Sequence, residues 1–244
     1  MHHHQQVRVS VSYLYLYIIY NDKIKISHYT QLLRLIMKWI NQFTVSKIPF
    51  YVYKLNKGDS IIYVQNKAQD TSIIIAHGSL YLLKIFTNKE ILALGILNQK
   101  NIIHTLSEKP YCYYKLIAIE VSFLISFKLI DLISNDNSQT NLLINVIKAS
   151  QTTLYKYEMM NNILVHKYTK NRVIQLILFL CKEFGLVKQN RIIIPFHISQ
   201  LTISIITGSN RCTINKIMHR LYIRNAISYS NQKYIYVVDP FKLF

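Results

Sequence analysis

The chain has 244 residues, 51% of them hydrophobic, which is enough for a substantial core and excludes an intrinsically disordered protein. Its 29 Lys and Arg outnumber 11 Asp and Glu, and the formal net charge of +18 favours anionic partners such as nucleic acid or an acidic membrane surface. No apolar run reaches the roughly 18–20 residues of a membrane span, and three cysteines without a CxxC pair argue against a zinc site or a disulfide framework.

The N-terminal residues 1–30 form a segment to which the sequence assigns no overall structure. The segment opens with Met1-His2-His3-His4, which fits a disordered terminus better than a metal site, and it lacks a signal-peptide pattern. The run from Val9 to Tyr20 reads as a strand, because serines interrupt it and tyrosines fill it. Residues 31–42 carry apolar side chains at helical intervals and predict a helix.

A β-rich region begins at Pro49. Short runs of β-branched and aromatic residues alternate there with turn residues such as Lys57-Gly58-Asp59 and His77-Gly78. Strands at this spacing predict a sandwich or barrel of about eight strands. No intervening stretch is long enough for a crossover helix, which argues against a doubly wound sheet.

A long helix is predicted next, because no Gly or Pro occurs from Gln139 to Phe184. Apolar and polar residues step through it by alternating four and three positions, which indicates a coiled-coil-like seam. The seam consists of Leu143, Ile147, Ser150, Leu154, Tyr157, Asn161 and Leu164. It predicts either packing on the chain's own β-region or pairing of two subunits. We favour pairing because the seam is long and follows a complete β unit, and Ser150 and Asn161 would then fix its register.

A possible hinge at residues 167–170 precedes a second helix, which Gly185 ends. A short strand is predicted over residues 191–196, and a hairpin is predicted around Ser230-Asn231-Gln232.

Between this strand and the hairpin, two helices joined by a glycine are predicted from Ser199 to Leu221. Ser199 and Ser209 are expected to cap the two helices, and Gly208 supplies the positive φ of a tight turn. One face of the second helix is apolar, with Ile214, Ile217, Met218 and Leu221. The candidate DNA-contacting residues on its other side are Arg211, Cys212, Thr213, Asn215, Lys216, His219 and Arg220.

A DNA-reading helix needs this division, with an apolar face docked on a scaffold and a hydrogen-bonding face free for the major groove. Arg211 lies in the first turn and can bind guanine O6 and N7 with two hydrogen bonds. Asn215 can read adenine, and Lys216 can reach a base or a phosphate. An ordinary amphipathic helix with a solvated basic face is the alternative. The cap, the Gly208 turn and the hairpin that follows favour a helix-turn-helix.

Three stretches, RVIQLILFLCKEFG, IIIPFHISQLTISIITGSNRCTINKIMHRL and KYIYVVDP, resemble the winged helix-turn-helix of the CRP/FNR family of transcription factors. The run Glu158-Met159-Met160 and the LCKEFG ending at Gly185 are most similar to the nitrogen-regulator branch of cyanobacteria and plastid genomes. The resemblance extends from about residue 31 to the end and is strongest over residues 154–240. It implies an α+β fold with an N-terminal antiparallel β-roll of the cyclic-nucleotide-binding type, a long dimerisation helix and a C-terminal winged helix-turn-helix.

The resemblance also implies domain boundaries and residue roles. The parts would be an extension (1–30), a sensor-like β-roll (31–130), a dimerisation helix (131–166) and a DNA-binding domain (167–240). Arg211 matches the base-contacting arginine, and Lys216 stands where this branch usually has a second arginine, which loses the planar fork. Ser199, Gln200 and Leu201 match phosphate-facing positions of the first helix, but a leucine cannot bond a phosphate.

In this family the β-roll binds a small anionic effector, a cyclic nucleotide or 2-oxoglutarate, through a glycine-rich corner and an arginine. Here no arginine lies between Arg34 and Arg172, His104 takes the place of the corner glycine, and the arginine position falls near Cys112. Compensation would come only from point charges on Lys100, Lys109 and Lys115. We therefore assign no cofactor, although the resemblance points to 2-oxoglutarate.

The expected function is a homodimeric, sequence-specific regulator, with double-stranded DNA and RNA polymerase as partners and no membrane. Plastid (chloroplast) residence is expected from the resemblance and from an excess of Lys, Asn, Ile and Tyr that AT-rich codons produce. The main alternative is a basic nucleic-acid-binding protein without sequence preference. Membrane-surface binding through the Tyr-rich N-terminus stays open. Scattered histidines and the absence of a nucleophile elbow or phosphate-binding loop argue against an enzyme.

Overall fold

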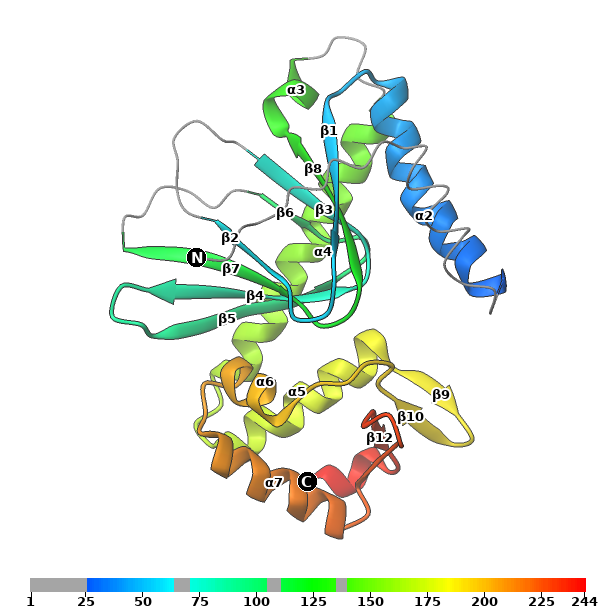
Figure 1. Ribbon diagram of the computed structural model, residues 1–244. Coiled ribbons are helices and arrows are strands. Elements are labelled where there is room, and N and C mark those ends of the chain that lie inside the picture. The colour runs from blue at the N-terminus through cyan, green and yellow to red at the C-terminus, as the bar shows by residue number, and fades with distance from the viewer. Residues whose placement is uncertain (1–25, 64–70, 105–110, 135–139) are drawn as a thin grey trace.

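The computed structural model describes residues 26–63, 71–104, 111–134 and 140–244, with side chains from residue 36 onward. A β-roll and a smaller C-terminal unit (residues 169–244) lie one above the other, and one long helix runs between them (Figure 1). This arrangement confirms the predicted α+β fold class. The strand prediction for Val9 to Tyr20 lies outside the described residues.

The β-roll consists of two antiparallel four-stranded sheets, with strand orders β1-β8-β3-β6 and β2-β7-β4-β5. The strands are β1 (Phe50–Leu55), β2 (Ser60–Tyr63), β3 (Thr71–His77), β4 (Ser79–Phe86), β5 (Ile91–Asn98), β6 (Ile102–Ile103), β7 (Cys112–Ala118) and β8 (Ser122–Lys128). Apolar side chains of both sheets, such as Ile75, Leu82 and Leu124, fill the space between them. Gly58 and Gly78 both have φ of +90° and form turns, as predicted.

Helix α2 (Ile26–Val45) covers the outer face of the first sheet and is longer than the helix predicted over residues 31–42. Its buried Ile36, Ile40 and Phe43 pack with β3 and β8, and the rings of Phe43 and Phe127 lie 4.8 Å apart. Helix α3 (Leu129–Ile133) follows β8 directly. The same apolar cluster continues into α4, so α4 is fixed to the β-roll.

Helix α4 (Thr140–Leu164) carries two parallel stripes that differ by one residue in register. The stripe packed against its own chain consists of the buried Leu142, Val146, Ala149, Thr153, Lys156, Met160 and Ile163. The predicted seam is the neighbouring stripe. Leu143, Ile147 and Leu154 on it are 37%, 49% and 65% exposed. Three other seam residues contact their own chain: Ser150 is bonded to His104, Tyr157 packs against the β-roll core, and Leu164 packs against the cluster around α5. The uncovered part of the seam is therefore Leu143, Ile147 and Leu154.

The C-terminal unit combines helices with a four-stranded sheet of order β11-β12-β10-β9. Its elements are α5 (Thr169–Phe184), β9 (Leu186–Lys188), β10 (Arg191–Ile193), α6 (Gln200–Ile206), α7 (Arg211–Ile223), β11 (Ile227–Tyr229), β12 (Ile235–Val237) and the 3-10 helix η1 (Pro240–Leu243). The hairpin predicted around Asn231 is β11–β12, which confirms that expectation. The strand predicted over 191–196 ends at Ile193 and pairs with β9, which was not predicted.

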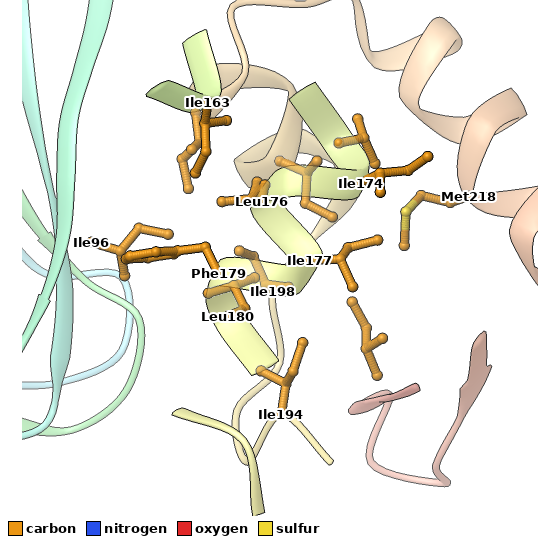
Figure 2. Close-up of a cluster of buried hydrophobic side chains, with 14 of the residues drawn as sticks. Ile96, Ile163, Ile174, Leu176, Ile177, Phe179, Leu180, Ile194, Ile198 and Met218 are labelled. Carbon is orange, nitrogen blue, oxygen red and sulfur yellow. The ribbon is translucent and has the colours of Figure 1, made fainter. Parts of the chain in front are cut away.

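One hydrophobic cluster joins the β-roll to the C-terminal unit. Ile96 from β5 lies beside Phe179 of α5, and Ile174 and Ile177 on the other side of α5 face Met218 of α7 (Figure 2). The unit is therefore packed against the β-roll as well as joined to it through α4. Within the described residues, no helix has both the length and the apolar character needed to cross a membrane.

Candidate nucleic-acid interface

The turn between α6 and α7 places the two helices. Ser199 caps α6, because its Oγ accepts a hydrogen bond from the Thr202 N–H at 3.0 Å. Gly208 has φ of +59°, the left-handed conformation predicted for this turn. The prediction that Ser209 caps α7 is wrong. Asn210 is the cap, with its Oδ1 accepting from the Cys212 N–H at 2.8 Å, while the Ser209 hydroxyl bonds to the Thr207 carbonyl.

The apolar face of α7 docks on the rest of the unit as predicted. Ile214, Met218 and Leu221 are at most 2% exposed, and Ile217 is half-buried. Full burial of such side chains contributes about 1.5–3 kcal/mol each. The helix is therefore held by one face on the cluster around α5, and its opposite face is left to solvent.

The opposite face of α7 is open and basic. All seven predicted contact residues on this helix are exposed: Arg211, Cys212, Thr213, Asn215, Lys216, His219 and Arg220. Among the described residues, no carboxylate lies within ion-pairing distance of its arginines or lysine. The face therefore presents uncompensated positive charge and free hydrogen-bond donors, as an anionic polymer requires.

The surroundings of two predicted residues differ from those of the rest. The Ser199 hydroxyl is used in the α6 cap and lies 2.8 Å from Thr202 Oγ1. Arg220 lies at the edge of the α7 face, where it lines a small depression with Lys170 and Arg224. At the start of α6, Gln200 is half-buried and Leu201 is exposed, so this turn offers an amide and an apolar side chain.

Arg172 on α5 holds the helix-turn-helix to the end of α4. Its guanidinium donates to the carbonyl oxygens of His166 at 2.8 Å and Thr207 at 2.9 Å, with a longer bond of 3.4 Å to Lys167. The α4–α5 connection and the last turn of α6 are thereby tied to one side chain. Sequence reasoning missed this role, because nothing distinguishes Arg172 from the other cations of the chain.

A second basic group forms where the β-roll, the segment before α6 and the β11–β12 hairpin meet. Lys57 Nζ lies 3.4 Å from His197 Nδ1. Partial burial lowers the pKa of His197, and the charges of Lys57 and Lys233 lower it further. His197 is therefore more readily neutral and can accept a hydrogen bond from Lys57. We call these three residues the flank cluster. No sequence pattern indicated it, since its members are far apart in the chain.

The β-roll corner offers little to an anionic effector. His104, in the place of the corner glycine, is hydrogen-bonded to Ser72 and Ser150, and burial lowers its pKa. Lys100 is exposed and Lys115 half-buried, whereas Lys109 lies outside the described residues. In the part of the chain that the structure describes, no three His, Cys, Asp or Glu side chains are placed to hold a metal ion.

Comparisons with known proteins cover both parts of the molecule. No protein-family model matches the chain. It is 26% identical over 206 residues to ycf28 of Porphyra purpurea, named as an HTH-type transcriptional regulator, covering 84% of this chain and 85% of that protein. It is 22% identical over 202 residues to the global nitrogen regulator of Synechococcus elongatus, covering 81% and 90%. A solved structure of a CRP-family transcriptional regulator from Thermus thermophilus matches with a TM-score of 0.63 at 15% identity, covering 78% and 94%.

Proposed function

We propose that this chain, a transcriptional regulator with the fold of the CRP/FNR family, binds a near-palindromic operator as a homodimer. The observation that carries the proposal is α7, which packs its apolar face on the rest of the unit and leaves its basic face exposed. Two such helices would enter successive major grooves about 34–36 Å apart.

The exposed seam of α4 supports the homodimer. Leu143, Ile147 and Leu154 form an uncovered apolar row along one helix, and a second copy of α4 is the partner that a heptad-spaced row fits. The exposed Asn161 continues the same row, whereas Tyr157 packs against the β-roll core of its own chain. Asn161 would fix the register of the pair, whereas the Ser150 hydroxyl is already bonded within its own chain.

The first half of α7 is proposed to contact the bases. Arg211 would bind guanine O6 and N7, Asn215 would bind adenine, and Lys216 would contact a base or a phosphate. Positioning contacts with the backbone are assigned to the remaining predicted residues, Ser199, Gln200, Ser209, Cys212, Thr213, His219 and Arg220.

The flank cluster extends this surface beyond the recognition helix. Lys57, His197 and Lys233 lie together next to the β11–β12 hairpin, where a wing would run beside the DNA backbone. Phosphates of the duplex outside the operator core are the groups that this charge would meet.

The genes that the protein controls, its compartment and its further partners are also proposed. The similarity to the global nitrogen regulator of Synechococcus elongatus supports control of nitrogen-related genes. Plastid residence is proposed from the excess of Lys, Asn, Ile and Tyr that AT-rich codons produce. RNA polymerase is the proposed further partner. We propose that no cofactor is needed and that 2-oxoglutarate does not control DNA binding, because His104 is engaged at the corner where the anion would bind.

Operator binding by purified protein tests the proposal. Fluorescence anisotropy would compare a nitrogen-regulator-type palindrome, a palindrome selected from random duplexes, and a scrambled duplex, each with and without 2-oxoglutarate. Arg211→Ala should reduce the preference for the palindrome by about 5- to 150-fold per half-site, as expected for losing one bidentate base contact. Arg191→Ala, an exposed arginine on β10, is the matched control and should keep the preference.

Equal binding to all duplexes, unchanged by Arg211→Ala, would overturn the proposal that the protein binds a specific DNA sequence. It would leave the second candidate, a basic nucleic-acid-binding protein, which the net charge of +18 favours. Preference for the selected palindrome but not for the nitrogen-type one would reject the nitrogen role alone.

A further inference from the structure

The corner between β5 and β6 is fastened to α4 by polar contacts. The Ile102 N–H donates to Thr153 Oγ1 at 2.9 Å, and Asn101 Nδ2 donates to Thr152 Oγ1 at 3.4 Å. Ile102, Asn101 and Thr153 are all buried. The corner is therefore held on the helix by directional bonds in addition to apolar packing.

His104 completes this connection by bridging two serines. Its Nδ1 lies 2.9 Å from Ser72 Oγ on β3, and its Nε2 lies 2.8 Å from Ser150 Oγ on α4. The Ser150 hydroxyl also lies 2.9 Å from the Val146 carbonyl oxygen, to which it can donate. In a neutral imidazole one nitrogen donates and the other accepts, so His104 donates to one serine and accepts from the other. The neutral imidazole has a partner at both nitrogens, in keeping with its lowered pKa.

From Ser150, α4 continues to the C-terminal unit. Lys156, six residues further on, forms an ion pair with Glu183 of α5. Arg172 then ties the connection after α4 to the end of α6. A rotation of α4 at the corner would thus be carried to α7 through buried or half-buried contacts. It would also turn the exposed Leu143, Ile147 and Leu154 of the seam, to which Ser150 belongs.

We propose that His104 is a positioning residue that holds α4 in the arrangement that binds the operator. This inference rests on the proposed function, because operator binding is its readout.

A double-mutant cycle tests the bridge. His104→Ala and Ser150→Ala should each raise the operator Kd by about 3- to 10-fold, as expected for the loss of one or two ordinary hydrogen bonds. The double variant should be no worse than the weaker-binding single variant, because both remove the same contact. The matched control is Ser134→Ala, which loses a hydroxyl bonded four residues back on α3 in the same way but is remote from the corner. It should bind like wild type.

Chemical rescue distinguishes the loss of the His104 hydrogen bonds from the loss of its packing. Imidazole added to His104→Ala should restore operator affinity, whereas pyrrole, which has the same shape and no acceptor nitrogen, should not. Circular dichroism and sedimentation would show that each variant is a folded dimer. Wild-type affinity in folded His104→Ala, additive losses in the double variant, or equal effects of imidazole and pyrrole would overturn the inference. Loss of operator preference in the wild type would instead reject the proposed function.

Discussion

The ion pair between Lys156 and Glu183 connects α4 to α5 in a largely buried setting. Lys156 is 5% exposed and Glu183 is 18% exposed. The Lys156 ammonium also lies 5.3 Å from the centre of the Phe179 ring and 5.5 Å from that of Phe184. Burial lowers the pKa of Lys156, and the hydrogen bond and charge of Glu183 offset part of this effect. Glu183→Gln would therefore leave a buried ammonium without its carboxylate.

Loss of one partner of a buried pair costs about 3–5 kcal/mol. For a chain of this size, each kcal/mol lowers Tm by about 2–4 °C, so Glu183→Gln should lower Tm by roughly 6–20 °C. Thermal and urea unfolding followed by circular dichroism would measure the change. Lys156→Met should cost less, because the remaining carboxylate is more exposed and the methionine still packs on the two rings. Glu158→Gln, an exposed glutamate on the same helix, is the control.

The pH dependence gives an independent check. Because the pKa of Lys156 is lower in the folded chain than in the unfolded chain, the unfolded chain binds more protons between the two values. Stability should therefore rise with pH from the lowered pKa up to the ordinary lysine value of about 10.4. Without the carboxylate, this rise should begin at a lower pH in Glu183→Gln. Equal stability of the Glu183 and Glu158 variants, with the same pH profile, would refute the reasoning.

Three further outcomes are expected. Gly208→Ala should cost about 1–2 kcal/mol, because alanine resists the φ of +59°, and should also weaken operator binding. Gly58→Ala, at φ of +90°, should lower Tm but leave binding to a duplex trimmed to the operator unchanged. Lys57→Ala should reduce the slope of log Kd against log salt by about one on a duplex with long flanks, and a duplex trimmed to the operator should show no change. Leu154→Glu should dissociate the dimer in sedimentation experiments, whereas Lys148→Glu, elsewhere on the exposed surface of α4, should not; a dimeric Leu154→Glu would argue against the seam.

The features of the fold that could be predicted from the sequence are those determined by residues close together in the chain. Turn glycines at positions 58, 78 and 208 and the two-faced spacing of α7 depend on neighbours within a few residues, so they were readable. The α7 cap was missed by one position. Ser209 and Asn210 are both good capping residues, and the choice depends on backbone angles, with Asn210 extended at φ −73° and ψ 138°.

The contacts that sequence did not predict join residues far apart in the chain. Arg172 reaches Thr207, His104 reaches Ser150, and Lys57 meets His197 across 140 positions. Each depends on how the β-roll and the C-terminal unit pack, and a single sequence holds no pattern for such pairs. The spacing of the α4 seam could not show that the buried stripe lay one residue away, nor that Ser150, Tyr157 and Leu164 contact their own chain.

The two stripes of α4 limit how the length of this helix can change during evolution. One residue turns a helix by about 100°, so deleting a single residue near its start would bring the seam to the positions that the buried stripe now occupies. Side chains such as Lys156 would then be turned out of the interior, and Leu154 would be turned toward it. An insertion of seven residues would restore the facing but lengthen the helix by about 10 Å, moving the C-terminal unit away from the β-roll surface on which it packs. This helix can therefore change by substitution but not by insertion or deletion. Relatives that bind DNA in the same geometry should differ in its amino acids while keeping its number of residues.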